Sequence, residues 1–369
     1  MSKRRFGIVG ALCLAILTML SAHGAFATAP ANTGYDDTIQ VIRGVGSDTT
    51  YLAMQKIEAL YNQGPGCALL ARETGGDIDD WYQTCQTTTG TVGANYDHDV
   101  AVSDFPAGSG AGVRMIGSAT PGHQVDYARS SRDKQSGDAV GLSFNGFAKD
   151  GIAVVTMDGR TTANFTKAQL IGVFATCTIT TWGQIYGNAD TTPIRPYGVQ
   201  TSSGTYLTFK NYLGGTNDPN ACANAIGTGR VLFENDASQI SAGSDGPNAV
   251  WWMSFGPYST NLAKRATAAA WTVENVSLDF STINDNSYPI TRYLWHVIKV
   301  SAETATTGQA GATRAFRDWI CKPLSGHITN PNTDRSFFTD ISGALSASGF
   351  QRVPTAESDA GTRCIRQTT

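Results

Sequence analysis

Short apolar runs alternate along the chain with loops rich in glycine, serine and threonine. The run Ile39–Val41 predicts a strand that leads into one such loop at residues 44–50. Within Met54–Tyr61 the apolar residues recur three and four positions apart, which indicates a helix with one buried face. Gln63–Gly66 is expected to end that helix.

The same order of strand, polar loop and helix recurs later. Ile194–Val199 predicts a strand, Thr201–Thr205 a polar loop, and residues 206–213 a helix with apolar side chains along one face. Two more polar loops lie at residues 108–112 and 129–132. Strands that alternate with helices predict an α/β fold.

Two apolar runs far apart in the sequence, Gly151–Val155 and Ile290–Val300, predict further strands. A chain of this length is too long for one ordinary core, so two domains are favoured. We expect the two runs to flank the passage of the chain into the second domain and back.

The first 27 residues have the features of an export signal. Lys3–Arg5 is basic, Ile8–Leu20 is apolar, and Ala25–Ala27 places small residues where signal peptidase cleaves. The apolar run is too short to span a bilayer comfortably, which favours a cleaved signal over a membrane anchor. We expect cleavage after Ala27 and a secreted or periplasmic mature chain that starts at Thr28.

Charge narrows the possible partners. The signal carries three of the 27 Lys and Arg residues and none of the 30 Asp and Glu residues, so the mature chain has a net charge of about −6. No basic cluster occurs in it, which argues against nucleic acid as a partner. A bound anion would have to be held locally, by backbone N–H groups and hydroxyls.

Six cysteines remain after the signal, which contains Cys13, has been removed. An even number in an exported chain predicts disulfides. The absence of a CxxC pair argues against zinc and thioredoxin-like chemistry. Six cysteines allow 15 connectivities. The simplest joins sequence neighbours: Cys67–Cys85, Cys177–Cys222 and Cys321–Cys364.

The four polar loops together predict an oxyanion site. Helix N-termini present unpaired N–H groups and partial positive charge, and Ser and Thr hydroxyls add donors. The alternative is that Ser47, Asp48, Ser203 and Thr205 are ordinary helix caps. For one loop the cap is the better interpretation, whereas the recurrence in several loops favours a binding site.

Enzyme signatures are sparse. GxxxxGK[ST], HExxH and GxSxG are absent, and the histidines have no metal-ligand spacing. We therefore expect no enzyme, no cofactor and no metal. Trp251 and Trp252 could stack on sugar rings, but neighbouring tryptophans more often have one ring packed and one partly exposed.

In their order and spacing, several segments resemble the phosphate-binding proteins of bacterial phosphate ABC importers, the PstS-like family. The match extends over most of the mature chain. The segments that carry it are Gly44–Thr49, Gly108–Val113, Val125–Tyr127, Gly151–Val155, Phe165–Phe174, Ser203–Thr205 and Tyr288–Ile290.

The resemblance implies a two-lobed type II periplasmic-binding-protein fold, the Venus flytrap. Lobe one would combine residues 28–150 and 289–369, and lobe two would hold residues 151–288. A monomer would capture inorganic phosphate or a similar oxyanion between the lobes and deliver it to an ABC transporter permease. The implied ligand-binding residues are Ser47, Asp48, Thr49, Ser109, Arg129, Ser131, Arg132, Ser203, Gly204 and Thr205.

Two departures from the family pattern concern the ligand. The family usually has an aspartate, which accepts a proton from phosphate, where this chain has Ser131, and an arginine where it has Val199. Arg129 and Arg132 lie nearby and could balance an anion's charge. The departures lend support to an alternative function, a secreted non-transport binding module for another anion or a cell-surface glycan.

Asp48 is our candidate for the missing carboxylate. It lies in the first polar loop, and a fixed carboxylate would accept the proton of phosphate and repel sulfate. The alternative is that Asp48 is only the N-cap of the helix that begins near Tyr51.

Overall fold

The computed structural model describes residues 42–61, 68–72, 83–86, 94–95, 108–117, 125–241, 245–260, 268–305, 308–327, 329–330 and 333–367. The predicted signal and the predicted strand Ile39–Val41 lie outside these residues. The predicted disulfide Cys67–Cys85 also lies outside them, because Cys67 is not among the described residues. Within these ranges, no helix has the length and apolar character needed to cross a membrane.

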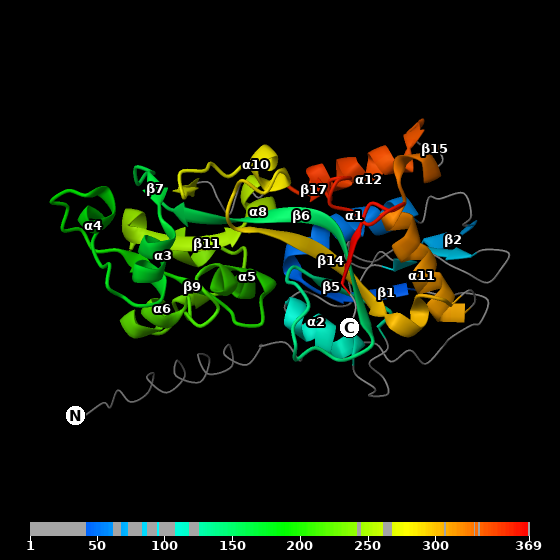
Figure 1. Ribbon diagram of the computed structural model, residues 1–369, viewed down its shortest axis with the longest axis horizontal. Helices are drawn as coiled ribbons and strands as arrows, with labels where there is room; N and C mark the ends of the chain where they lie inside the picture. Colours follow the sequence, from blue (N-terminus) through cyan, green and yellow to red (C-terminus); the bar gives the residue numbers. More distant parts are fainter. Residues whose placement is uncertain are drawn as a thin grey trace, which may run out of the picture.

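One large sheet runs through the described part of the molecule, in the order β4-β1-β5-β14-β6-β11-β8, and β12, β17 and β18 also pair with β6 (Figure 1). The strands are β1 Ile42–Gly46, β4 Ala94–Asn95, β5 Tyr127–Ser130, β6 Leu142–Thr156, β8 Arg195–Pro196, β11 Ala249–Ser254, β12 Ala269–Ala270, β14 Thr291–Lys299, β17 Gln351–Arg352 and β18 Ile365–Gln367.

Shorter strands form separate two-stranded sheets. The pairs are β2 Ala68–Arg72 with β3 Gln83–Gln86, β7 Asn164–Phe165 with β13 Thr272–Val273, β9 Gly198–Val199 with β10 Val231–Leu232, and β15 Thr329–Asn330 with β16 Arg335–Ser336.

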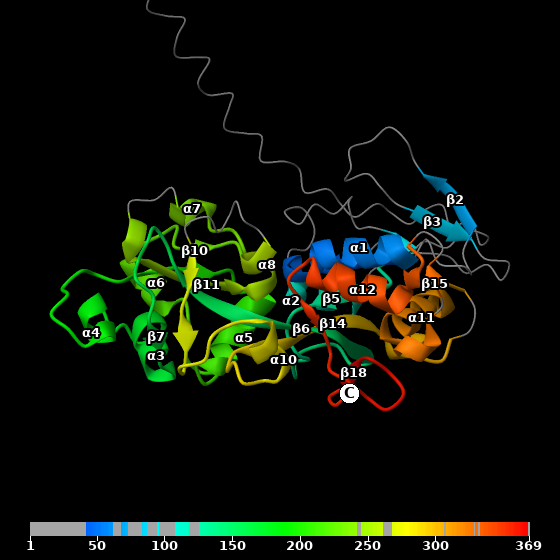
Figure 2. The same ribbon diagram turned by 90° about the horizontal axis from the view of Figure 1, so that it is seen from above.

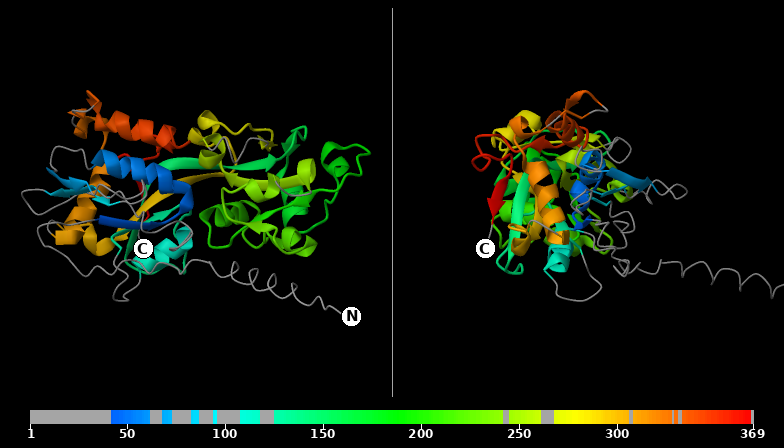
Figure 3. Two further views of the ribbon diagram at one scale, coloured as in Figure 1. Left: turned by 180° about the vertical axis from the view of Figure 1, so that it is seen from behind. Right: turned by 90° about the vertical axis from the view of Figure 1, so that its right-hand side faces the viewer.

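The molecule has two halves, each with its own apolar core (Figures 1 and 2). All buried members of one core lie between Ile152 and Ile290, and we call this part the central half. The other two clusters draw on residues 53–148 and 294–364, so this terminal half combines early and late segments of the chain. Figure 3 shows the same two halves from behind.

The helices are divided between the two halves. Helices α1 and α12 lie side by side in the terminal half, over the sheet (Figure 2). The terminal half has α1 Tyr51–Tyr61, α2 Ser109–Ile116, α11 Gly308–Cys321 and α12 Phe337–Ser346, and the central half has α3 Lys167–Phe174, α4 Trp182–Tyr186, α5 Gly204–Tyr212, α6 Ala221–Ile226, α7 Ser238–Ser241, α8 Phe255–Thr260 and α10 Phe280–Asn284.

The long strands β6 and β14 connect the halves. They pair antiparallel from Thr291 opposite Gly151 to Lys299 opposite Leu142. The run Ile290–Val300 was predicted as a strand, and β14 confirms it. The run Gly151–Val155 is only the end of β6, whose 15 residues are all buried. The first part of β6 contains polar residues, so the apolar pattern of the sequence did not indicate a strand there.

Four local predictions were wrong. In the predicted loop 108–112, residues 109–112 belong to α2, and in the predicted loop 129–132, residues 129 and 130 belong to β5. Residues 44–46 were expected to be loop, but they belong to β1 and pair parallel with β5. Gly46 has a φ of +122°, and because it lacks a Cβ the backbone of Arg129 can approach it closely. A Cβ at this position would lie 2.3 Å from the Arg129 carbonyl oxygen. The predicted strand 194–199 is broken into β8 and β9, since its two pieces pair with different strands.

Both tryptophans of the Trp251–Trp252 pair are fully buried. The Trp252 ring stacks on Phe209, with ring centroids 4.6 Å apart, and the Trp251 Nε1–H donates to the Gly198 carbonyl oxygen. The expectation that one of the two rings is exposed is therefore wrong, and neither ring is available to stack on a sugar.

Two of the three predicted disulfides lie among the described residues, and both are present. Cys177–Cys222 spans 45 residues in the central half, and Cys321–Cys364 spans 43 residues in the terminal half. Crosslinks over loops of this length contribute roughly 3–4 kcal/mol each by restricting the unfolded chain. Each half therefore has its own covalent crosslink.

Candidate functional site

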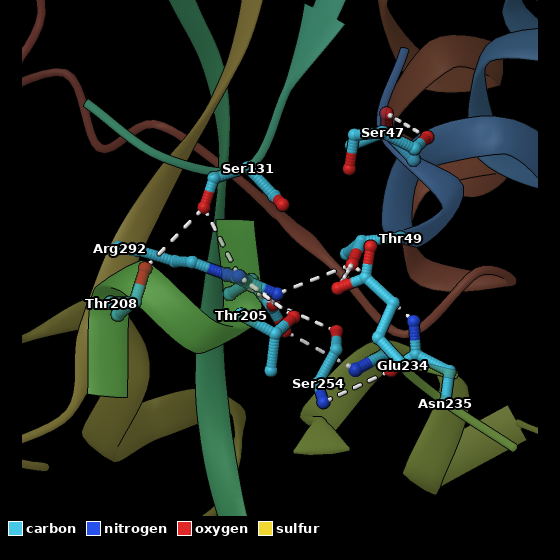
Figure 4. Close-up of polar contacts among 12 residues, drawn as sticks. Ser47, Thr49, Ser131, Thr205, Thr208, Glu234, Asn235, Ser254 and Arg292 are labelled. Carbon is cyan, nitrogen blue, oxygen red and sulfur yellow. Dashed lines mark hydrogen bonds and ion pairs between the residues drawn. The ribbon is translucent and has the colours of Figure 1, made fainter. Parts of the chain in front are cut away.

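Polar side chains from five segments meet between the two halves (Figure 4). Thr49 and Ser131 come from the terminal half, Thr205 and Glu234 come from the central half, and Arg292 reaches them from β14. All five residues are buried. Because buried polar groups need hydrogen-bond partners, each of these side chains is expected to be hydrogen-bonded.

Arg292 is at the centre of this network. Its Nη1 donates to the Ser131 carbonyl oxygen and to Thr205 Oγ1, both at 3.1 Å. Its Nη2 donates to Thr49 Oγ1 at 3.4 Å. One guanidinium group thus contacts three segments that are far apart in the sequence.

Asp150 holds Arg292 in place. The two residues are cross-strand neighbours on β6 and β14. Asp150 Oδ2 lies 2.9 Å from Arg292 Nε and 2.7 Å from Nη2. The carboxylate also accepts from Ser254 Oγ at 2.8 Å and from the Gly256 N–H at 3.2 Å. A buried ion pair is tolerated when its remaining acceptor positions are satisfied in this way.

Ser109, Ser131 and Gly204 touch where the halves meet. The Ser131 N–H donates to Ser109 Oγ at 2.9 Å, and the two hydroxyl oxygens lie 3.1 Å apart. A Cβ on Gly204 would lie 2.3 Å from Ser131 Oγ and 2.7 Å from Ser109 Oγ. Only glycine allows this approach without a shift of the neighbours.

Ser203 is both a helix cap and a member of the network. Its Oγ accepts from the backbone N–H groups of Thr205 and Tyr206, which caps α5. Its hydroxyl donates to Glu234. The partial positive charge of the helix N-terminus is thereby directed at the site. The two interpretations from the sequence, cap and binding residue, are compatible at this position.

Glu234 and Asn235 follow β10 and complete the network. Thr49 Oγ1 donates to Glu234 Oε2 at 3.4 Å, across 185 positions of sequence. Asn235 Nδ2 donates to Thr49 Oγ1 at 3.4 Å, and Asn235 Oδ1 accepts from the Ser254 N–H at 3.2 Å. The first polar loop is therefore tied directly to the central half.

The structure directs Arg129 and Arg132 to other partners. Arg129 donates to backbone carbonyl oxygens of residues 44–47, including Ser47 at 3.3 Å and Gly44 at 3.4 Å. Arg132 donates to both carboxylate oxygens of Asp138, at 2.6 and 2.7 Å. The guanidinium that contacts Thr49, Ser131 and Thr205 is that of Arg292.

Ser47 and Asp48 lie at the start of the first helical turn. Ser47 is at the N-cap position of the 3₁₀ turn Asp48–Thr50, which leads into α1. Asp48 is the first residue of that turn, so it is not the N-cap. The Ser47 hydroxyl is buried and has no hydrogen-bond partner among the described residues. It can therefore donate to a group that enters the site.

Sequence reasoning missed Asp150, Glu234, Asn235, Ser254 and Arg292. Two of these residues could have been noticed from their positions in the sequence. Arg292 stands inside the apolar run Ile290–Val300, and Asp150 precedes Gly151–Val155. Charged residues in buried strands are rare unless they are paired. Glu234 lies in a turn with no motif around it, so its position could not be found from the pattern.

The described residues contain no group of three or more His, Cys, Asp or Glu side chains placed to hold a metal ion. The site is instead a set of hydroxyl, amide and guanidinium donors with two carboxylates. Donors of this kind, directed from several sides at one buried point, suit an oxyanion.

Comparison with known proteins identifies the family. A family model described as PBP superfamily domain matches residues 86–323. The chain belongs to the PBP superfamily. This PBP superfamily chain is similar in structure to a putative phosphate ABC transporter substrate-binding protein with bound phosphate from Clostridium perfringens. That likeness has a TM-score of 0.55 and 19% identity, and it covers 85% of this chain and 100% of the other.

A high-affinity periplasmic phosphate-binding protein called PfluDING, bound with phosphate, is a second structural neighbour. Its TM-score is 0.50 and its identity 16%, over 85% of this chain and 91% of that one. These likenesses show the fold of the PBP superfamily chain, which is the expected two-lobed periplasmic-binding-protein fold.

A curated relative in sequence is Alkaline phosphatase L of Pseudomonas aeruginosa. It is 34% identical to this PBP superfamily chain over 130 residues, which is 35% of this chain and 32% of the relative. The match thus spans about a third of the relative's length.

Proposed function

We propose that this PBP superfamily protein captures phosphate or a similar tetrahedral oxyanion between its halves and delivers it to an ABC importer. The observation that carries the proposal is the convergence of Arg292 with the hydroxyls of Thr49 and Thr205 and with the Ser131 carbonyl oxygen in a buried site. Two structural neighbours are described as phosphate-binding proteins, one of them for an ABC transporter.

The chemistry of these groups matches a tetrahedral anion. Such a ligand has oxygens in four directions, and donors approach this site from both halves and from β14. Hydrogen bonds to a charged acceptor are about twice as strong as neutral ones. The net charge of the mature chain is negative, so long-range attraction of anions is weak and these local donors would supply the affinity.

Closure of the two halves would trap the ligand. Contacts such as Thr49 with Glu234, and the Gly110 N–H with the Ser202 carbonyl oxygen at 3.4 Å, join the halves directly. A ligand that contacts both halves stabilises the closed state by its differential affinity for that state. We propose that the lobes are residues 28–150 with 289–369, and residues 151–288, and that β6 and β14 form the hinge.

The remaining features of transport form part of the same proposal. The signal would be cleaved near Ala27, and the monomeric mature chain would act outside the cytoplasm. Its partner would be a membrane permease that recognises the closed form. The alternative is a secreted non-transport module on the same fold, which would bind another anion or a cell-surface glycan.

Isothermal calorimetry on residues 28–369 tests the ligand class. We expect phosphate to bind with one site per chain and neutral oligosaccharides to give no heat of binding. Binding of an oligosaccharide without phosphate would replace the transport proposal with the glycan-binding alternative.

One observation favours a second function, hydrolysis of a phosphate monoester. It is the 34% identity over 130 residues to a protein named as an alkaline phosphatase. Release of p-nitrophenol from p-nitrophenyl phosphate tests this function, with Arg292→Gln as a control for contaminating phosphatase. Turnover that disappears in the variant would support hydrolysis at this site, and equal turnover in both proteins would attribute it to a contaminant.

A further inference from the structure

Glu234 is the second buried carboxylate of the site, besides Asp150, among hydroxyl, amide and guanidinium donors. Its side chain extends toward Thr49 (Figure 4), and the residue is 3% exposed. Glu234 Oε2 accepts from the hydroxyls of Ser203 and Thr49. Its other oxygen, Oε1, is buried and has no hydrogen-bond partner among the described residues.

The charges of the described network do not cancel. The Arg292 guanidinium is matched by Asp150, at 2.7 Å. The charge of Glu234 is met only by hydroxyls and, through Ser203, by the N-terminus of α5. A second anion placed beside this carboxylate would be repelled unless it supplied a hydrogen-bond donor of its own.

Protonated and unprotonated oxyanions differ in this respect. Inorganic phosphate near neutral pH carries at least one P–OH group, which can donate to a carboxylate oxygen. Sulfate is fully ionised and has no proton to donate. Beside Glu234 Oε1, phosphate therefore gains a charge-assisted hydrogen bond, whereas sulfate leaves two like charges in contact.

From this geometry we propose that Glu234 makes the site select oxyanions that carry a proton, phosphate above all, over sulfate. This inference rests on the proposed function. It assigns to the central half a role that the family resemblance places at Ser131, in the terminal half. Ser131 cannot perform it, because its side chain is a hydroxyl paired with Ser109.

Calorimetry with phosphate and sulfate on three proteins tests the inference. The wild type is expected to bind phosphate at least roughly 100-fold more tightly than sulfate, the factor that a loss of about 3 kcal/mol produces. Glu234→Gln keeps the shape of the side chain but offers an amide donor, so it should gain sulfate affinity and reduce the preference to about tenfold or less. Glu274→Gln, the same substitution at an exposed glutamate of the central half outside the network, is the matched control, and it should leave the preference unchanged.

Each other outcome has a definite meaning. Glu234→Gln that binds phosphate and still excludes sulfate overturns the inference. If Asp48→Asn, measured in the same way, gains sulfate affinity and Glu234→Gln does not, the role belongs to Asp48, as the sequence suggested, and the inference is overturned. If the wild type binds neither anion, the proposed function itself fails, and this result is distinguished by the absence of heat with phosphate.

A second variant covers the case in which Glu234→Gln does not fold. Glu234→Asp retains the charge but withdraws it by one methylene. It should weaken phosphate binding by about tenfold, since the hydrogen bond lengthens, and it should still exclude sulfate. Equal affinity of this variant for the two anions would contradict the role of the carboxylate.

Discussion

Arg292 and Asp150 face each other across β14 and β6, and their side chains form an ion pair 2.7 Å long inside the sheet. The pair lies on the two strands that connect the halves. With two of its nitrogens on Asp150, Arg292 is held so that Nη1 and Nη2 also contact Thr49, Ser131 and Thr205. A structural ion pair thus orients the one cation of the described network.

Removal of Arg292 should affect stability and binding separately. Arg292→Gln leaves the Asp150 carboxylate buried without its cation, which costs about 3–5 kcal/mol of unfolding free energy. The double variant Arg292→Gln/Asp150→Asn removes that unpaired charge, so most of the stability should return. Phosphate binding should stay lost in both. Urea unfolding and calorimetry measure the two effects, and a double variant that binds phosphate like the wild type would show that Arg292 is only structural.

Ser203→Ala should weaken anion binding more than it weakens the fold. Loss of one hydrogen bond to a charged ligand costs roughly 1–3 kcal/mol of binding free energy, and loss of the α5 cap costs about 1 kcal/mol of stability. Thr166→Ala is the matched control, because Thr166 caps α3 by accepting from the Gln169 N–H. It should lose the same stability and keep its phosphate affinity. Equal phosphate binding in the two variants would reduce Ser203 to a cap.

Gly204→Ala should hinder closure. The added methyl group would lie 2.3 Å from Ser131 Oγ and 2.7 Å from Ser109 Oγ, so the halves could not approach as they do here. We expect phosphate affinity to fall at least tenfold, about 1.4 kcal/mol, with little change in secondary structure. Gly343→Ala in α12 is the control, because a Cβ there meets nothing within 4 Å. Unchanged affinity in Gly204→Ala would mean that this contact is not needed for binding.

His296 should make the protein less stable in mild acid. The residue is fully buried, its ring stacks on Tyr127 with centroids 4.4 Å apart, and burial lowers its pKa from 6.5 to about 3. Between about pH 3 and pH 6.5, His296 therefore binds a proton in the unfolded chain but not in the folded chain. The unfolding free energy should therefore fall as pH drops below 6.5, by up to about 1.4 kcal/mol per pH unit from this residue.

The variant His296→Phe isolates that contribution. It keeps an aromatic ring against Tyr127 and has no titrating group at this position. Urea unfolding of both proteins at several pH values between about 4 and 8 should give a shallower acid slope for the variant. Parallel slopes would show that other groups, such as His327, whose pKa burial lowers to about 4, cause the acid sensitivity.

The parts of this molecule that could be predicted are those with local signals. The helix that begins after Ser203 has a cap, an apolar face and a glycine end, and all three are present. The α/β class followed from the repeated order of strand, loop and helix. Thr49, Ser109, Ser131 and Thr205 stand in segments whose composition marked them, and the structure brings them together.

The residues that were missed depend on contacts between distant segments. Asp150 and Arg292 become partners only through the pairing of β6 with β14, which no local pattern encodes. Glu234 reaches Thr49 across 185 residues from an ordinary turn. In the same way, residues 44–46 resemble a glycine loop until β5 pairs with them. Tertiary pairing, and not local propensity, determines these positions.

The most direct test of the central claim is a crystal structure of residues 28–369 grown with inorganic phosphate. We expect phosphate to lie between the halves, within hydrogen-bond distance of Arg292, Thr49 and the N-terminus of α5. We also expect one of its oxygens to lie beside Glu234. Phosphate bound at another place, with this network intact and empty in a closed molecule, would contradict the account.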